Sequence, residues 1–281
     1  MTMSPPTHAW TFDPEDPRAP SQAVWDAMSD EEQQFVIQSL PSEVPPGFMG
    51  MMPEGDRHGR PIALITDALK RHFGNRGREA YIGSDFMVYY PSEQCFAPDV
   101  LVVLEAGAHQ RDSWNVSKEG KGLDLVIEVL VGGNRRKDLE RNVDRYARLG
   151  IVEYFVFEPV AARLHAFRLP EDGGVYERVV PQHGRYPCQL LGFDLTVVDN
   201  HLRFVSDDLT LPTTWEVAER LNSAVDELGR KVDQEIARAE AESKRADAAD
   251  ERADAATLRT ADLERQLAEM RKQLEEARKT P

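Results

Sequence analysis

The spacing of hydrophobic residues changes several times along the chain, and each change predicts a different kind of element. Apolar residues repeat with helical spacing in three stretches, which predicts helices over 21–40, 61–73 and 135–149. Runs dense in β-branched and aromatic residues, bounded by glycines, prolines and loops, predict strands instead. Strands are expected over 81–90, 100–104, 123–130, 153–157, 164–169, 175–180 and about 195–204.

The order of these elements predicts an α/β protein. The stretch 123–130 is almost wholly apolar, as is typical of a central strand that is buried on both faces. The predicted helix 135–149 and the predicted strand 153–157 follow it, and such a strand–helix–strand unit implies a parallel crossover. The remaining strands would complete a mixed sheet with antiparallel edges.

The composition changes from about Thr214, where Ala, Glu, Arg and Asp begin to dominate. Apolar or small residues then recur in alternating steps of four and three from Leu221 to Ala277, interrupted by Glu235, Glu242 and Thr260. This heptad pattern predicts a coiled coil that would make the chain a homo-oligomer. A lone charged helix is the alternative. The expected organisation is a flexible arm over 1–20, a folded domain over 21–213 and the coiled-coil helix over 214–281.

Composition narrows the class of protein without naming its chemistry. The chain has 281 residues, of which 41% are hydrophobic, and a formal net charge of -15. This charge argues against a surface that coats nucleic acid throughout, so any contact with nucleic acid must be local. The chain shows no secretion signal and no apolar run of membrane-spanning length, so a cytoplasmic protein without a membrane partner is expected. Its 2 cysteines cannot make a disulfide framework.

Two carboxylates interrupt apolar strand-like runs, where an unpaired charge is costly. Asp99 precedes the run 100–104, and Glu128 lies within the run 123–130. If the two strands lie in one sheet, both acids could share a divalent cation, with the carbonyl of Val129 as a further oxygen ligand. Alternatively, Asp99 caps a turn and Glu128 pairs with an arginine of the following helix.

The residues around these acids resemble a known family. The segments 96–103, 123–130 and 153–155, together with Asp138, Tyr146 and Gly150, resemble the Uma-two family of restriction-endonuclease-like proteins in the PD-(D/E)xK nuclease superfamily. The resemblance covers about residues 25–205. It implies a restriction-endonuclease-like fold, in which a central mixed sheet is flanked by helices. It also implies that Asp99 and Glu128 are the acids that bind the metal, Mg²⁺ or Mn²⁺.

The chain departs from the pattern of this family at the expected lysine. The superfamily places a lysine two residues after the second acid, where this chain has Leu130, and the family generally moves it to the position that corresponds to Asn142. An amide cannot supply the positive charge that stabilises a pentacovalent phosphate. Lys137, near the start of the same helix, could reach the strand edge and replace it, or it could be a solvated lysine.

Other residues could complete the site. Glu54 and Asp85 are possible accessory acids, whereas Asp124 and Asp138 are expected to be structural. The helix 135–149 also carries a cluster of basic residues, in which a phosphate backbone could bind or which could pair with neighbouring acids. The predicted nucleic-acid contacts are Arg135, Arg136, Arg141 and Arg145, and a second basic patch comprises Lys70, Arg71, His72, Arg76 and Arg78. His58, His72 and His165 are expected at the surface.

These observations favour a divalent-metal-dependent nuclease that acts on nucleic acid, with DNA as the expected substrate. Asp99, Glu128 and Lys137 would be its catalytic residues, and Asp99, Glu128 and Val129 would bind the metal. Asn142 favours a different class: a nuclease fold that no longer cleaves and serves as an oligomerising or partner-binding module.

Overall fold

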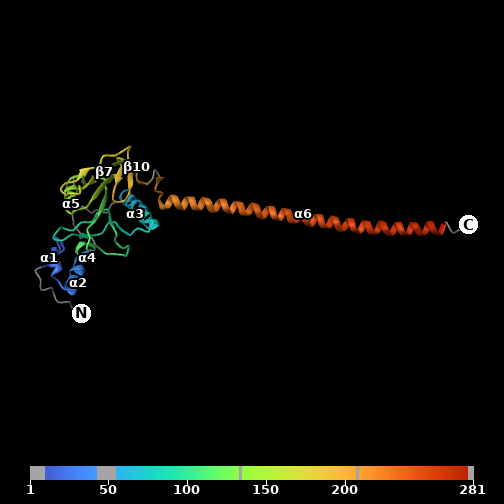
Figure 1. The fold of residues 1–281 in the computed structure, drawn as a ribbon, viewed down its shortest axis with the longest axis horizontal. Helices are drawn as coiled ribbons and strands as arrows, with labels where there is room; N and C mark the ends of the chain where they lie inside the picture. Colours follow the sequence, from blue (N-terminus) through green and yellow to red (C-terminus); the bar gives the residue numbers. More distant parts are fainter. Residues whose placement is uncertain (1–9, 43–54, 133–134, 207–208, 278–281) are drawn as a thin grey trace. The chain divides into compact units, whose positions relative to one another are not determined.

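A computed structural model describes the chain except for residues 1–9, 43–54, 133–134, 207–208 and 278–281, and the side chains of 273–277. The chain divides into two compact units, Met1–Thr214 and Trp215–Pro281. The first unit contains the sheets and the shorter helices, and the second consists of the long C-terminal helix (Figure 1).

A mixed six-stranded sheet forms the centre of the first unit. Its strand order is β1-β3-β5-β6-β7-β8. Neighbouring strands are antiparallel except β5 and β6, which are parallel and joined by a helical crossover. The predicted mixed α/β fold and its parallel crossover are therefore confirmed. The strands are β1 (Ala80–Gly83), β3 (Val100–Leu104), β5 (Leu125–Val129), β6 (Glu153–Glu158), β7 (Arg163–Arg168) and β8 (Glu177–Arg178).

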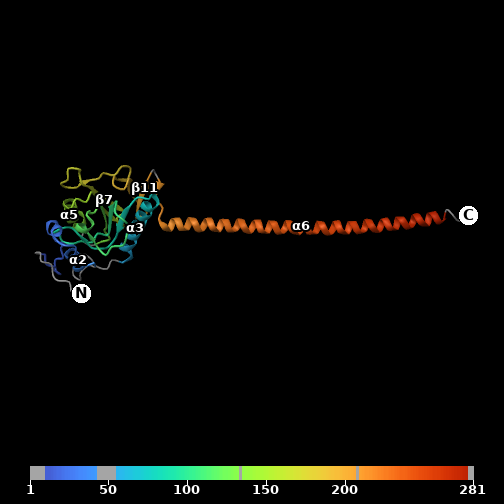
Figure 2. The same cartoon turned by 60° about the horizontal axis from the view of Figure 1, so that its bottom comes forward.

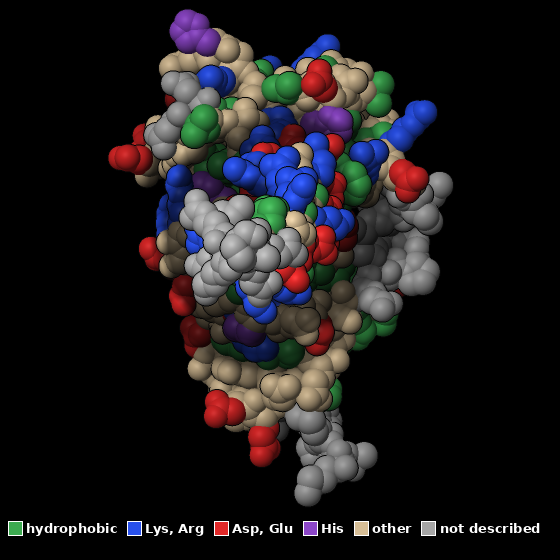
Figure 3. Space-filling view, turned by 90° about the vertical axis from the view of Figure 1, so that its right-hand side faces the viewer, with side chains coloured by type: hydrophobic (Ala, Val, Ile, Leu, Met, Phe, Trp, Pro, Cys, Tyr) green, Lys and Arg blue, Asp and Glu red, His purple; other side chains and the backbone are tan. Residues whose placement is uncertain are grey.

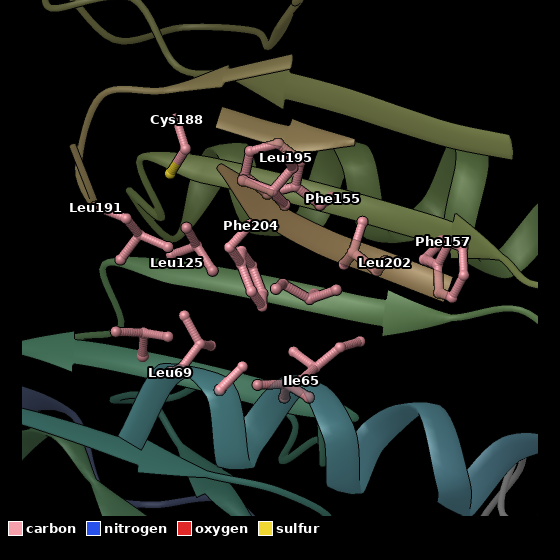
Figure 4. Close-up of a cluster of buried hydrophobic side chains, with 14 of the residues drawn as sticks. Ile65, Leu69, Leu125, Phe155, Phe157, Cys188, Leu191, Leu195, Leu202 and Phe204 are labelled. Carbon is pink, nitrogen blue, oxygen red and sulfur yellow. The ribbon is translucent and has the colours of Figure 1, made fainter. Parts of the chain in front are cut away.

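Each face of this sheet is covered by a different set of elements. Alternate residues of β5 point to opposite faces, because side chains alternate along a strand. Leu125 and Ile127 pack against helix α3 (Asp56–Arg76) and against a second, four-stranded sheet (Figure 4). Val126 and Leu130 pack on the other face with Tyr146 of helix α5 (Asn142–Arg148). The central strand is thus buried on both sides, as its apolar sequence predicts.

The second sheet corrects the prediction of one strand over 195–204. Two antiparallel strands occupy this region, and Asp199 and Asn200 turn the chain between them with φ of 50° and 60°. Positive φ at both central residues is the requirement of the tight hairpin turn that suits twisted strands. The order of this sheet is β12-β11-β10-β9. Its strands are β9 (Tyr186–Cys188), β10 (Phe193–Val198), β11 (His201–Ser206) and β12 (Leu209–Thr210).

The predicted strand 81–90 is also interrupted. It divides into β1 and β2 (Val88–Tyr89), and β2 pairs with β4 (Trp114–Asn115) instead of joining the central sheet. Gly83 ends β1 where Phe86 folds back so closely that an added Cβ would lie 2.3 Å from the Phe86 ring. Asp85 then takes a left-handed conformation with φ 53°, which interrupts the extended backbone of a strand.

The N-terminal helical region is split by a capping box. The predicted helix 21–40 forms α1 (Gln22–Asp26) and α2 (Asp30–Ser39), because Ser29 and Glu32 exchange hydrogen bonds at the start of α2. Ala19, within the predicted arm, is buried beside Met87 and Tyr89, so the packed region begins before residue 21. Residues 1–9 of the predicted arm lie outside the described residues.

The connections near the functional strands are short helices. Helix α4 (Val116–Glu119) lies between β4 and β5, and the predicted helix 135–149 contains a π-helical turn, η1 (Lys137–Arg141), before α5. The backbone N–H of Asn142 donates to the backbone carbonyl of Lys137, five residues earlier, which is the hydrogen bond of a π-turn. Such turns often occur at functional sites.

The second unit is one uninterrupted helix, α6 (Thr214–Ala277; Figures 1 and 2). Its large apolar heptad residues from Leu221 to Met270 are exposed, and the coiled coil remains a prediction. Exposed side chains of both charge signs are visible in Figure 3. None of the helices in the described part of the chain combines the length and the apolar character needed to cross a membrane.

His72 is buried, contrary to its predicted place in a surface basic patch. Its ring packs edge-on against Phe193, with ring centroids 4.8 Å apart, and its Nε2 has no hydrogen-bond partner among the described residues. Burial lowers the pKa of His72, and the nearby charges of Arg76 and Arg78 lower it further. Folded His72 therefore resists protonation more than unfolded His72 does.

His72 should consequently make the fold sensitive to acid. The unfolded imidazole binds a proton as the pH falls below about 6.5, whereas the folded one does not, so stability present above that pH is lost as the pH falls. We expect a smaller drop in thermal midpoint between pH 7 and pH 5 for His72→Phe than for the wild type. The exposed His109→Ala is the control, and equal drops in all three proteins would contradict this role for His72.

Candidate active site at the ends of β3 and β5

The register of β3 and β5 brings the two predicted acids together. The strands are antiparallel, with Val100 opposite Ile127, so one further step places Asp99 opposite Glu128. The Asp99 amide lies 3.5 Å from Glu128 Oε2, and the Val129 amide donates to Asp99 Oδ2 at 2.6 Å. The two carboxylates therefore converge from neighbouring strands, and neither is paired with a guanidinium among the contacts of the described residues.

A polar stripe on the crossover helix faces Glu128. Tyr146 donates its hydroxyl proton to Glu128 Oε1 at 2.7 Å, and the amide of Asn142 lies 3.4 Å from the same oxygen. Asn142 also donates to Asp138 Oδ1 at 3.1 Å. Residues 138, 142 and 146 are each four apart, so they lie along one face of a helix. Asp138, for which the sequence predicts a structural role, belongs to this buried network.

The electrostatics of Glu128 reflect this crowding. Burial raises the pKa of Glu128 well above its ordinary value, and the negative charge of Asp99 raises it further. Lys137 opposes both effects by lowering that pKa. Glu128 is thus a buried acid whose ionised form needs positive charge nearby.

Lys137 is a cationic side chain that interacts electrostatically with both acids. Its Nζ lies 3.6 Å from Asp138 Oδ1. Burial alone lowers the pKa of Lys137, but the negative charges of Glu128, Asp138 and Asp99 together outweigh this effect and raise it. The lysine therefore remains charged next to the carboxylate pair, although it lies five residues before the position that the family pattern uses.

His58 is a member of the site that the sequence did not predict. It lies in the first turn of α3, and its Nε2 is 3.1 Å from Asp99 Oδ2. The side chains of His58 and Asp99 are 15% and 14% exposed, so the expectation of a surface histidine is wrong here. His165 is also largely buried and contacts Glu158 at 2.7 Å. The spacing of the histidines along the sequence gave no sign of either contact.

The other predicted acids lie in different positions. Asp85 is exposed in the turn after β1, but its amide lies 3.3 Å from the carbonyl of Pro98, next to Asp99. Asp124 accepts a hydrogen bond from the Leu104 amide at 2.7 Å and pairs with Lys121 at 3.1 Å, which is a structural arrangement. Glu54 lies outside the described residues.

The four arginines predicted to bind nucleic acid differ in their contacts. Arg135 pairs with Glu158, and Arg136 pairs with Glu140 one helical turn away. Arg145 donates to the carbonyl of Gln94 and lies over the Phe96 ring at 4.5 Å, and burial lowers the pKa of its guanidinium. Arg145 thus packs within the domain. Arg141 is exposed to solvent.

The donor set suits a small, hard cation. Two carboxylates and the carbonyl of Val129 offer oxygen ligands, and Mg²⁺ commonly takes one or two protein carboxylates together with water and substrate oxygens. Among the residues that the structure describes, no cluster of three or more His, Cys, Asp and Glu side chains could hold a metal ion. The mutual repulsion of Asp99 and Glu128 nevertheless fits a shared divalent cation, which would relieve it.

The fold and the comparisons together identify the class of protein. A mixed sheet flanked by helices is the arrangement of restriction-endonuclease-like folds. The chain belongs to the Uma2 family, described as "Putative restriction endonuclease", whose model matches residues 42–198. The chain is also similar to "a putative nuclease belonging to DUF820 from Anabaena variabilis ATCC 29413", at 16% identity and a TM-score of 0.43, over 58% of this chain and 96% of that one. No curated protein matches the chain.

Proposed function

We propose that the chain is a divalent-metal-dependent nuclease that hydrolyses phosphodiester bonds in nucleic acid, with DNA as the expected substrate. The observation that carries this proposal is the convergence of Asp99 and Glu128 beside Lys137 at the ends of β3 and β5. Membership of the Uma2 family, whose description is "Putative restriction endonuclease", supports it. A cytoplasmic location remains a prediction from the sequence.

Each side chain of the site has a distinct task in this proposal. Asp99, Glu128 and the Val129 carbonyl would hold Mg²⁺ or Mn²⁺, and the cation would supply Lewis acidity toward the phosphodiester and acidify water. Lys137 offsets the negative charge that develops on the phosphate in the transition state. Tyr146 and Asn142 hold the Glu128 carboxylate in place through its Oε1 atom. Arg135 and Arg136 are held in ion pairs, and Arg145 packs against Phe96. The exposed Arg141 is therefore the arginine most available to contact a phosphate.

A second function remains open because Asn142 replaces the expected lysine. Its amide contacts both Glu128 and Asp138 within the buried network. A protein in which these contacts have replaced catalysis would keep the fold as a partner-binding module and would not cleave.

Cleavage of nucleic acid by the purified chain separates the two functions. Supercoiled plasmid, linear DNA and RNA would be incubated with Mg²⁺, with Mn²⁺ and with a chelator. We expect cleavage that requires a metal ion. Absence of cleavage of every substrate with both metals would overturn the proposal and favour the partner-binding module.

His58 should strengthen metal binding by orienting Asp99. His58→Ala removes the contact of the imidazole with Asp99 Oδ2 but leaves the hydrogen bond from the Val129 amide. We therefore expect Mn²⁺ to bind more weakly, with a dissociation constant about tenfold larger. His58→Asn, which keeps a donor, should restore part of the loss. His165→Ala is the matched control, because it removes a histidine–carboxylate contact from Glu158 instead. Equal Mn²⁺ affinities, measured by calorimetry for the wild type and His58→Ala, would exclude this role.

A further inference from the structure

Helix α6 exposes apolar side chains at both of its ends. Between them lies an alanine-rich segment in which Ala239, Ala246 and Ala253 follow the same heptad spacing. The apolar residues at these heptad positions form an apolar stripe along α6. The large side chains of this apolar stripe are between 48% and 63% exposed, although such residues are normally buried. They are Leu221, Val225, Leu228 and Val232 at the first end, and Leu263, Leu267 and Met270 at the second.

The residue types in the apolar stripe indicate how many helices pair and in which orientation. In the heptad abcdefg, the steps of three and four place Val225 and Val232 at a, and Leu221 and Leu228 at d. Branched Val at a with Leu at d favours a two-stranded parallel coiled coil over larger assemblies. We propose that α6 pairs with α6 of a second copy of this chain as a parallel, in-register dimer.

The charges beside the stripe disfavour the antiparallel alternative. Five successive g positions are basic, and in an antiparallel pair g faces g, which would create five like-charge contacts. In a parallel pair, g faces the e position five residues further along the second copy. Arg245 then faces Asp250 and Arg259 faces Glu264, and each contact occurs twice in the dimer. The basic g residues are Lys231, Arg238, Arg245, Arg252 and Arg259.

Two layers of like-charged residues destabilise the parallel pair. Glu235 and Glu242 occupy d positions, so each would lie opposite its own copy. The basic g residues flank them, and Arg238 Nη1 already lies 3.9 Å from Glu235 Oε1 within the helix. The contacts of Arg238 with Glu235 and of Lys231 with Glu227 lie within one helix and are the same in both orientations. Between the helices, the parallel pair has four opposite-charge contacts against two like-charge layers, whereas the antiparallel pair has five like-charge g contacts, so the parallel pair is favoured.

The parallel orientation has a consequence for the proposed nuclease, on whose function this step rests. Both copies of the first unit would be attached at the same end of the coiled coil, because residue 214 begins both helices. An antiparallel pair would separate the attachment points by about 96 Å, the length of a 64-residue helix. Two active sites at one end suit the cleavage of both strands of a duplex.

Disulfide cross-linking of the full chain tests the orientation. Leu228→Cys should form a cross-linked dimer under mild oxidation, because parallel pairing places residue 228 opposite itself. Arg230→Cys, at the outward f position, is the matched control and should not cross-link. The native Cys95 and Cys188 are buried, so the wild type should remain uncross-linked. In an antiparallel pair, residue 228 would lie near residue 260 of the second copy. If mixed Leu228→Cys and Thr260→Cys chains cross-link with each other, and Leu228→Cys alone does not cross-link, the pairing is antiparallel and the proposal is overturned.

Charge exchange gives a second test that does not need cysteine. Arg259→Glu should raise the dimer dissociation constant about fivefold, since it places two acids together at both 259–264 contacts. Adding Glu264→Arg should restore the affinity, and Arg265→Glu at f should change it little. Tighter pairing of Arg259→Glu, or a wild type that sediments as a monomer, would refute the parallel dimer. Neither test uses cleavage, so failure here is distinct from failure of the proposed nuclease.

Discussion

Replacement of Asp99 by Asn, or of Glu128 by Gln, is expected to lower the rate of metal-dependent cleavage by about 10³-fold or more. Each change removes one of the two negative charges that would hold the cation, while it keeps the shape of the side chain. The amide oxygen introduced by Asp99→Asn could still accept the hydrogen bond of the Val129 amide, and the one introduced by Glu128→Gln could still accept that of Tyr146. The loss should therefore reflect chemistry and not unfolding.

Asp124→Asn is the matched control for these variants. Asp124 is an acid just before the same strand as Glu128, but it binds the Leu104 amide and Lys121. Its replacement should leave the cleavage rate nearly unchanged. Thermal unfolding without metal provides a further check, because Glu128→Gln removes a buried carboxylate whose pKa is raised by burial and by Asp99, and should not lower the midpoint. Wild-type rates in Asp99→Asn and Glu128→Gln would exclude the two acids from the reaction.

Replacement of Lys137 by Gln is expected to lower the cleavage rate by about 10²-fold to 10³-fold, with metal binding retained. Lys137 is the ammonium group whose charge acts on both acids, and its own pKa is raised by them. It contributes positive charge to the transition state but is not a metal ligand. The combination of a slow reaction and an unchanged Mn²⁺ affinity would distinguish it from Asp99 and Glu128.

The position of Asn142 offers a rescue experiment. Its amide lies 3.4 Å from Glu128, so a lysine at this position would carry its ammonium to the same carboxylate. We expect Asn142→Lys to restore cleavage in the Lys137→Gln background. Lys118→Gln, on helix α4, is the control for loss of a lysine elsewhere. If Lys137→Gln cleaves as fast as the wild type, the charge at this position is not used.

Much of the fold could be predicted because apolar runs define the central strands. The run 123–130 could only be accommodated in the middle of a sheet, and its single buried acid marked the site. The hairpin of β10 and β11 was missed, although Asp199-Asn200 between two apolar runs is a tight-turn signal. The interruption after β1 was missed because it depends on how closely Phe86 packs against Gly83, which no local pattern shows.

The site was partly predictable for the same reason. A carboxylate inside an apolar strand needs a partner, so the sequence predicts Asp99 and Glu128 as a pair, and the register of β3 and β5 places them opposite each other. The stripe of Asp138, Asn142 and Tyr146 could have been found from its spacing of four residues. His58 could not, because its contact with Asp99 spans 41 residues of sequence and depends on where α3 begins.

Calorimetric titration of the purified chain with Mn²⁺ tests the central claim most directly. We expect saturable binding to the wild type that is lost in the Asp99→Asn/Glu128→Gln double variant and retained in Asp124→Asn. A wild-type chain that binds no Mn²⁺, or a double variant that binds it equally well, would contradict the claim that these two carboxylates form a metal site.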